Sequence, residues 1–221
     1  MPNQQQMSNQ SLGVVILTGG HSQRMGYPKW ELPFGDENLL QRTVRTCRQI
    51  STEIVIAAGD GQVYSNREDL PKIIRDENPN CGPLEGIRGG LAYLEQRGLL
   101  WGFVTACDVP ELVPEVAENL LQQSDGFEAV IPYRAERVYG MTAIYQCKLH
   151  MQIDELIKNR QLRVSELSKQ FRANKIPADS LRSVDQELTS LANVNYPDQY
   201  LKILKKLGFP APAGFADPRG S

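Results

Sequence analysis

The sequence predicts an α/β fold with three layers, α/β/α, around a mostly parallel central sheet. Short apolar runs of strand length are separated by single segments whose apolar residues have helical spacing. The apolar runs are continuous, which is typical of strands buried on both faces of a parallel sheet. Glycine, acidic and amide residues directly follow several of these runs, where parallel sheets place their ligand sites.

Apolar runs predict the strands. The run 12–17 (LGVVIL) ends in Thr-Gly-Gly and the run 54–58 (IVIAA) ends in Gly-Asp-Gly, so each is expected to be a buried strand that meets a loop. Further strands are predicted at 72–75, 100–106, 129–132 and 142–145.

Helical spacing predicts the connections between the strands. The segment 84–97, for example, places Leu84, Ile87 and Leu91 on one stripe. Proline in the first turn supports a helix that begins near Pro114. Helices are predicted at 38–50, 84–97, 114–123, 148–158 and 163–171, and after Pro197.

Length and composition are those of one globular domain. The chain has 221 residues, of which 41% are hydrophobic and 23% charged, as in proteins that bury a sizeable core. The polar, uncharged residues 1–11 are predicted to form a disordered leader. The stretch 208–221, rich in Pro, Gly and Ala, is predicted to form a flexible tail, so a single domain is expected over 12–207.

Charge and patterning exclude several classes of partner. A net charge of −2 and a pI of about 5.8 indicate no basic face for a nucleic acid. No signal-peptide pattern and no membrane-spanning stretch is present, so no membrane partner is expected. The four cysteines are far apart and there are only two histidines, which favours reduced, buried thiols over a structural metal cluster. We therefore expect a cytoplasmic protein.

The loop from 17 to 29 has the composition of a phosphate site. Gly19 and Gly20 let the backbone approach a ligand closely, and Arg24 and Lys29 bring two positive charges, as a polyphosphate requires. The spacing is neither GxGxxG nor GxxxxGK(S/T), so the sequence predicts a phosphate-binding loop of another kind. The alternative is a glycine-rich turn that binds nothing.

Asp108, which follows the predicted strand 100–106, is the candidate metal ligand. A carboxylate there faces the same crevice as the first loop, and Mg²⁺ takes few protein oxygens and keeps water and substrate phosphates as its other ligands. Alternatively, Asp108 only caps the turn before Pro110. Asp76 is a weaker candidate of the same type, and Gly82 opens a helix N-terminus that suits an anion.

Two amide side chains, Asn193 and Asn195, lie just before the last predicted helix. Their oxygens suit a substrate or a metal. The alternative is an ordinary turn, because Asn is common in turns that bind nothing.

Taken together, these motifs resemble the molybdenum cofactor guanylyltransferase family, which belongs to the Rossmann-like nucleotidyltransferases. The resemblance extends over about residues 12–204, and the first loop is its most specific part. The segments that carry it are Leu17–Gly20, Arg24–Gly26, Gly82–Ile87, Cys107–Pro110 and Asn193–Gln199.

The resemblance implies a fold of the nucleotide-diphospho-sugar-transferase type and transfer of GMP from GTP to molybdopterin or Mo-molybdopterin, with release of pyrophosphate. It divides the domain into a nucleotide-binding half, 12–110, and an acceptor-binding half, 111–207. Lys29 and Arg24 would bind the triphosphate, and Asp108 would hold Mg²⁺, the expected cofactor. The other implied nucleotide contacts are Leu17, Thr18, Gly19, Gly20, Asp76 and Gly82. Transient contact with molybdenum-insertion proteins or molybdoenzyme chaperones is a further implication.

The sequence shows four departures from the family pattern, one of which is a pair of residues. Thr18 stands in place of alanine, which is tolerable if its hydroxyl points away from the base, and Pro28 stands in place of an acid. Glu85 stands in place of a small residue. Tyr139-Gly140 replaces a His-Pro or Gln-Pro pair, so this departure falls on the acceptor side. The implied acceptor contacts are Tyr139, Arg163, Asn193 and Asn195.

Two other functions stay open from the sequence. A sibling nucleotidyltransferase would transfer CMP to molybdopterin, or a nucleotide to a sugar or alcohol phosphate. Gly19 favours guanine, since the cytidylyl relatives usually have Ala-Ala-Gly in this loop. A non-catalytic nucleotide-binding protein is also compatible with the fold, but Arg24, Lys29 and Asp108 together favour an enzyme.

Overall fold

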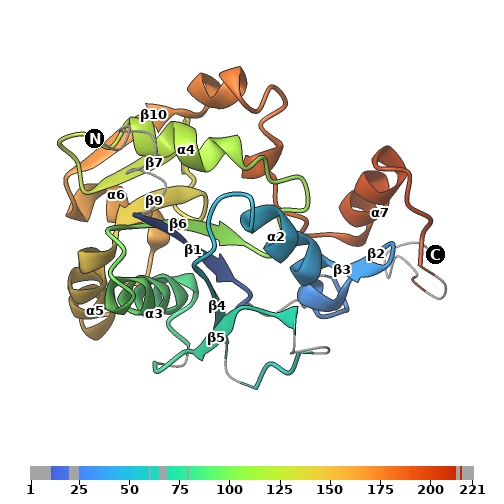
Figure 1. The fold of residues 1–221 in the computed structure, drawn as a ribbon, viewed down its shortest axis with the longest axis horizontal. Coiled ribbons are helices and arrows are strands. Elements are labelled where there is room, and N and C mark those ends of the chain that lie inside the picture. The colour runs from blue at the N-terminus through green and yellow to red at the C-terminus, as the bar shows by residue number, and fades with distance from the viewer. Residues whose placement is uncertain are drawn as a thin grey trace.

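A mixed, mostly parallel sheet forms the centre of the molecule (Figure 1). The structure is a computed structural model that describes residues 11–19, 25–59, 61–64, 69–78, 80–212 and 215. The strands of the sheet are β1 (Leu12–Leu17), β4 (Ile54–Ala58), β5 (Lys72–Arg75), β6 (Trp101–Ala106), β7 (Ala129–Arg134), β8 (Arg137–Val138), β9 (Ala143–Gln146) and β10 (Ala173–Pro177).

The strand order is β10-β7-β9-β6-β1-β4-β5, with β8 paired to β7. The strands β6, β1, β4 and β5 are parallel to one another, β9 runs antiparallel to both β6 and β7, and β10 is parallel to β7. Because the parallel strands all point the same way, their carboxyl ends lie along one edge of the sheet.

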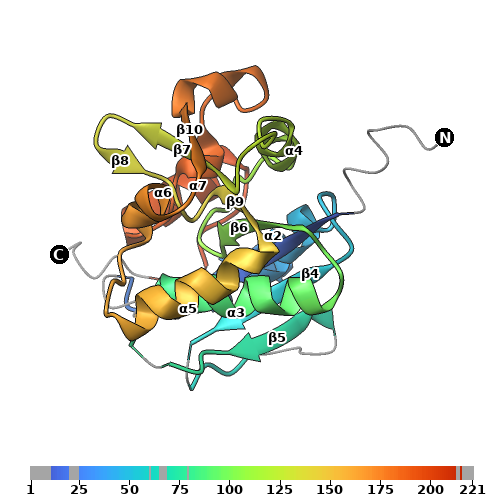
Figure 2. The same cartoon turned by 90° about the vertical axis from the view of Figure 1, so that its left-hand side faces the viewer.

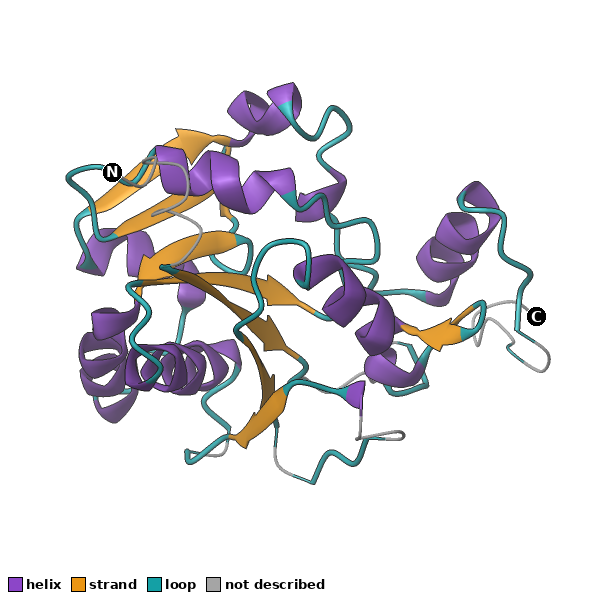
Figure 3. Cartoon of the chain, in the orientation of Figure 1, coloured by secondary structure: helices purple, strands orange, loops and turns teal. Residues whose placement is uncertain are grey.

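Helices cover both faces of the sheet, which gives three layers (Figure 3). On one face α3 lies beside α5, as Figure 2 shows, and α2 and α4 lie on the other. The helices are α2 (Leu39–Cys47), α3 (Pro83–Gln96), α4 (Glu115–Gln122), α5 (His150–Lys158), α6 (Leu167–Gln170) and α7 (Pro197–Lys206). Short 3-10 turns are η1 (Lys29–Glu31), η3 (Cys147–Leu149), η4 (Val164–Glu166), η5 (Ala178–Ser183) and η6 (Thr189–Leu191). The predicted fold class is confirmed.

The central strand β1 shows why the sheet needs helices on both sides. Val14 and Ile16 pack into the core under α2 and α4, whereas Val15 and Leu17 pack into the core under α3 and α5. All four side chains are buried. Successive residues of a strand point to opposite faces, so an unbroken apolar strand requires cover on each face.

A third core lies beside the sheet, around β2 (Pro33–Phe34), β3 (Glu37–Asn38) and α7. Phe34 and Tyr200 are fully buried there, and the Tyr200 hydroxyl donates a hydrogen bond to the Pro33 carbonyl. Phe209 packs on the same cluster, with its ring centroid 5.7 Å from that of Phe34. Packing therefore extends past residue 207, into the stretch that the sequence predicts to be a flexible tail.

The sequence patterns do not predict β10 or the β2–β3 hairpin. Only Ile176 of β10 is buried, because β10 is the edge strand of the sheet, and its sequence, in which Asn174 and Lys175 precede Ile176, gives no apolar run. The hairpin has two residues in each strand, too few to show a period.

All four cysteines are free and buried, as predicted. No helix in the described part of the chain has both the length and the apolar character needed to cross a bilayer.

Candidate active site

Backbone hydrogen bonds continue for one residue beyond the carboxyl ends of the parallel strands. The amide of Thr18 donates to the Ala57 carbonyl at 3.0 Å, and the amide of Cys107 donates to the Leu17 carbonyl at 2.9 Å. The amide of Asp76 donates to the Ala58 carbonyl at 3.2 Å. The loops that follow β1, β5 and β6 therefore start from a fixed frame, which places their side chains at one edge of the sheet.

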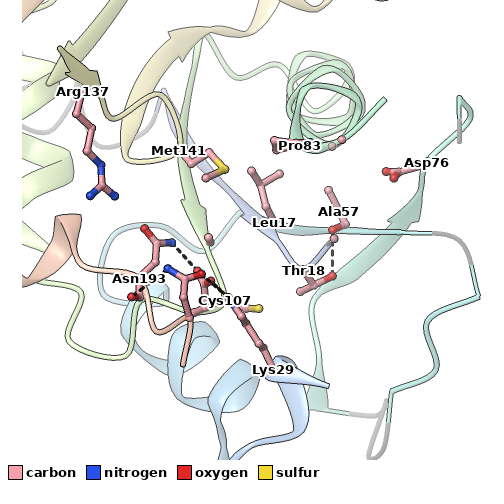
Figure 4. Close-up of a pocket in the computed structure, with 16 residues that line it drawn as sticks. Leu17, Thr18, Lys29, Ala57, Asp76, Pro83, Cys107, Arg137, Met141 and Asn193 are labelled. Atoms are coloured by element: carbon pink, nitrogen blue, oxygen red, sulfur yellow. Dashed lines mark hydrogen bonds and ion pairs between the residues drawn. The ribbon is translucent and has the colours of Figure 1, made fainter. Parts of the chain in front are cut away.

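A pocket of about 290 Å³ lies at this edge (Figure 4). Figure 4 shows Asp76 at one end, Arg137 at the opposite end and Lys29 between them. The lining residues are Leu17, Thr18, Gly19, Lys29, Ala57, Asp76, Gly82, Pro83, Gly86, Ala106, Cys107, Asp108, Arg137, Met141, Asn193 and Asn195.

Lys29 and Asp108 form an ion pair inside the pocket. The ammonium Nζ of Lys29 lies 2.6 Å from Oδ2 of Asp108 and donates a second hydrogen bond to Oδ1 of Asn195 at 2.9 Å. The other carboxylate oxygen of Asp108 accepts a hydrogen bond from Nδ2 of Asn193 at 2.6 Å. Two charges and two amides from three distant parts of the chain thus form one network.

The segment before α7 is held against the end of β6 by its backbone. The amide of Val194 donates to the carbonyl of Asp108 at 2.8 Å. The amides of Asn195 and Tyr196 both donate to Oε1 of Gln199, in the first turn of α7. The start of α7 therefore fixes Asn195 beside Lys29.

Thr18 turns its hydroxyl into the protein rather than into the pocket. The hydroxyl lies 3.1 Å from the Ala57 carbonyl and 3.0 Å from Oε1 of Gln62, and it also contacts the Tyr64 hydroxyl. Gln62 returns a hydrogen bond from Nε2 to the Thr18 carbonyl at 2.9 Å. Burial raises the pKa of Tyr64 to about 12, so this phenol remains a neutral hydrogen-bonding group. The hydroxyl of Thr18 therefore points away from the pocket, which is the condition under which threonine is expected to be tolerable at this position.

Glu85, the other departure in this half, holds the loop that follows Asp76. Its carboxylate is buried, pairs with Arg88 at 2.6 Å, and accepts hydrogen bonds from the backbone amide of Glu77 and the side chain of Asn78. Burial raises the pKa of this carboxyl, but the hydrogen bonds from Arg88 and Asn78 outweigh it, and the pKa lies below its usual value. Glu85 therefore stays ionised and fixes the wall of the pocket next to Asp76.

The structure brings most of the predicted site residues together. Those that line the pocket are Leu17, Thr18, Gly19, Lys29, Asp76, Gly82, Asp108, Asn193 and Asn195. Gly82 has φ of 64°, a conformation that glycine adopts readily, so the chain turns sharply into α3 at the pocket wall. Gly20 and Arg24 lie outside the described residues.

Two predicted acceptor contacts do not line the pocket. Arg163 is exposed to solvent just before η4. Tyr139 is half-buried against the core under α4, and its ring lies 4.7 Å from the guanidinium carbon of Arg137. Arg137 itself does line the pocket, although no sequence pattern predicts it as a site residue. Arg137 and Arg134 occupy the same short hairpin, and nothing in one sequence indicates which of the two faces the site.

Oxygen donors are available for a hard cation. Among the described residues, no group of three or more His, Cys, Asp or Glu side chains could hold a metal on its own. Asp108 supplies one carboxylate, with the amide side chains of Asn193 and Asn195 beside it. That donor set fits a divalent cation that takes most of its other ligands from water and substrate phosphates.

The site thus consists of glycine-bearing, basic and acidic loops at the carboxyl edge of the sheet, where α/β proteins bind their ligands. Residues 14–173 match the MobA-like NTP transferase domain. The chain belongs to this family of nucleotidyltransferases, whose members typically use a divalent metal.

Individual relatives agree with this assignment. A protein of Pelotomaculum thermopropionicum named probable molybdenum cofactor guanylyltransferase is 29% identical over 189 residues, which are 85% of this chain and 89% of that protein. One of the same name from Mycobacterium bovis is 32% identical over 190 residues, 83% of this chain and 89% of that protein. The crystal structure of molybdopterin-guanine dinucleotide biosynthesis protein A from Archaeoglobus fulgidus superposes with a TM-score of 0.73 at 23% identity, covering 89% of this chain and 98% of that one. At that identity the structure supports the fold alone.

Proposed function

We propose that the protein is a molybdenum cofactor guanylyltransferase, which transfers GMP from GTP to molybdopterin or Mo-molybdopterin and releases pyrophosphate. The observation that carries the proposal is the Lys29–Asp108 pair, with Asn195 beside it, in the middle of the pocket. The names of the relatives, whose similarity extends over most of the chain, support the choice of substrates.

The nucleotide would occupy the end of the pocket formed by the first loop and the start of α3. Leu17, Thr18 and Gly19 would offer backbone groups to guanine and ribose, and Asp76 and Gly82, which line the same pocket, would be further contacts of the nucleotide. The Thr18 hydroxyl already has partners in the protein, so the base would meet the backbone and not a free side-chain donor.

The triphosphate would lie over Lys29, with Arg24 of the same loop as its second cation. Asp108 would hold Mg²⁺, assisted by Asn193 and Asn195, and the metal when bound would neutralise charge on the phosphates. Lys29 must then exchange its contact with Asp108 for one with a phosphate oxygen. Its flexible four-carbon stem suits such a movement.

The reaction is a displacement at the α-phosphorus of GTP. An oxygen of the acceptor's terminal phosphate forms a bond to the α-phosphorus, while the bond from that phosphorus to the oxygen bridging to the β-phosphate breaks and pyrophosphate leaves. Lys29 and Arg24 would offset the charge that grows on the leaving group. No protein nucleophile is required, and Cys107, the thiol at the site, has a pKa raised by burial, so it stays protonated.

The proposal includes the cytoplasm as the location and GTP and molybdopterin as the partners. It also includes transient contact with molybdenum-insertion proteins or molybdoenzyme chaperones, which would supply the pterin and receive the product.

Release of pyrophosphate, measured with each nucleoside triphosphate in turn, tests the proposal. The full chain is supplied with Mg²⁺ and molybdopterin, and turnover with GTP is expected. Turnover with CTP alone, or with a sugar phosphate in place of molybdopterin, would identify a sibling enzyme. No release under any of these conditions would contradict an enzymatic role.

A further inference from the structure

Arg137 enters the pocket from the half of the molecule opposite the nucleotide loops. It lies on β8, in the hairpin that β8 forms with β7, and Figure 4 shows its side chain extending toward the side of the pocket where Asn193 lies. Asp76 lies at the far end of the same view. The residues at the two ends of the pocket therefore come from different parts of the chain, Asp76 from the loop after β5 and Arg137 from β8.

Charge singles out Arg137 among the residues at its end of the pocket. Of the described residues that line the pocket, Lys29 and Arg137 are the basic ones. Lys29 is paired with Asp108 at 2.6 Å. Within the described ranges, no acidic side chain forms an ion pair with Arg137, whose side chain is exposed. Arg137 is thus a cation with its guanidinium available to a ligand.

The guanidinium is held in place by Tyr139. The carbon Cζ of Arg137 lies 4.7 Å from the centre of the Tyr139 ring, a cation–π contact. The backbone of Tyr139 is bonded on both sides, since its amide donates to the Pro132 carbonyl and its carbonyl accepts from the Thr142 amide, each at 2.9 Å. The backbone of Tyr139 is therefore fixed and its ring packs against the core under α4, which gives Arg137 a platform.

The next residue explains why this platform has its particular place. A side chain at Gly140 would come within 2.5 Å of Val164 and 3.1 Å of the Tyr145 hydroxyl. That hydroxyl, on a fully buried residue, donates to the Gly140 carbonyl at 2.8 Å. Tyr139-Gly140, the departure from the family pattern, thus forms a unit in which glycine permits close packing and tyrosine supports Arg137.

We propose that Arg137 binds the terminal phosphate of the acceptor, with Tyr139 as the residue that positions it. This rests on the proposed function and names the charge that selects a phosphomonoester as acceptor. A guanidinium matches the paired oxygens of a phosphate, and an acceptor bound here would approach the nucleotide from the end opposite Asp76.

Steady-state kinetics of Arg137→Ala with GTP, Mg²⁺ and molybdopterin test the proposal. The KM for molybdopterin should rise about 10- to 100-fold, as expected for loss of a charge-assisted hydrogen bond, while the KM for GTP stays as in the wild type. Arg137→Lys should recover part of the loss, because it keeps the charge but not the planar fork.

Arg134→Ala is the matched control. Arg134 lies directly opposite Arg137 in the register of the two strands of the hairpin. It carries the same charge and is exposed, but it does not line the pocket. Its removal should leave the KM for molybdopterin unchanged. Tyr139→Leu should raise that KM by about two- to fivefold, and Tyr139→Phe, which keeps the ring, should not.

Equilibrium binding of molybdopterin without nucleotide decides the same question independently of turnover. Weaker binding by Arg137→Ala than by wild type and Arg134→Ala supports the proposal, whereas equal binding by all three overturns it. A rise in the KM for GTP alone would overturn it as well, by assigning Arg137 to the triphosphate. Failure of the proposed function is seen separately, as absence of GTP turnover in the wild type.

Discussion

Lys29 Nζ and Asp108 Oδ2 lie 2.6 Å apart, although the two residues are separated by 79 positions in the chain. Their side chains are only 18% and 12% exposed, so water screens the pair little. The pair places one cation and one anion side by side in a pocket with few other charged residues among its lining. We expect substrate to part them, with Lys29 moving to phosphate and Asp108 to the metal.

Asp108→Asn should abolish turnover without unfolding the protein. The amide keeps the shape of the side chain but removes the negative charge that would hold Mg²⁺. Pyrophosphate release, followed at increasing Mg²⁺, should stay at background, while circular dichroism matches the wild type. Glu111→Gln is the control. Glu111 forms an ion pair with Lys206, with 2.8 Å between the charged atoms, and does not line the pocket. Wild-type activity of Asp108→Asn at saturating Mg²⁺ would remove Asp108 from the metal site.

Lys29→Ala should lower kcat by about 10²–10³-fold, the usual cost of losing one preorganised group that stabilises transition-state charge. Stopped assays with GTP in excess measure it. Lys206→Ala, which removes the lysine of two ion pairs outside the pocket, with Glu111 and Glu187, should leave kcat unchanged. If Lys29→Ala changed only the KM for the acceptor, its assignment to the triphosphate would be wrong.

The sequence predicted the parts of this site that depend on local pattern. Asp108 follows an apolar run, and the rule that ligands lie beyond the carboxyl ends of strands points to the sheet edge where Asp108 lines the pocket. The contact between Lys29 and Asn195 joins residues 166 positions apart, and no local pattern encodes it. Arg134 and Arg137 lie opposite each other on the two strands of one short hairpin. Which of the two arginines reaches the pocket depends on how the hairpin packs against the rest of the protein.

Thr18→Val should lower the free energy of unfolding by about 1 kcal/mol, the usual net value of a hydrogen bond. The change removes the hydroxyl that lies against Ala57, Gln62 and Tyr64 but keeps the shape of the side chain. Urea denaturation measures the loss, and Thr18→Ser should restore most of it. The KM for GTP should not change, because the hydroxyl faces the protein. A large increase in that KM would show that the hydroxyl contacts the nucleotide.

Glu85→Gln should destabilise the protein at neutral pH and progressively less in acid. The folded-state pKa of Glu85 lies below its usual value, so the stabilisation from its charge is fully present above the unfolded-state pKa of about 4.3. It is lost as the pH falls through that value and then through the folded-state pKa. Urea denaturation of both proteins from pH about 7 to about 3 measures the difference in unfolding free energy.

Glu155→Gln provides the comparison for Glu85. Glu155 pairs with Lys158 at 2.8 Å, but its side chain is 66% exposed, and surface pairs contribute little to stability. Its substitution should change the unfolding free energy only slightly at any pH. A difference between wild type and Glu85→Gln that is equally flat would mean that the charge of Glu85 does not stabilise the loop beside Asp76.

Gly140→Ala should destabilise the fold by about 1–3 kcal/mol, the usual cost of overpacking a filled core. The added methyl group would lie 2.5 Å from a methyl of Val164, which must move to accept it. Val164→Ala removes that methyl, so the double variant should lose less stability than the sum of the single variants, as a double-mutant cycle with urea denaturation would measure. Additive losses would show that the close approach of Val164 is not the reason why position 140 requires glycine.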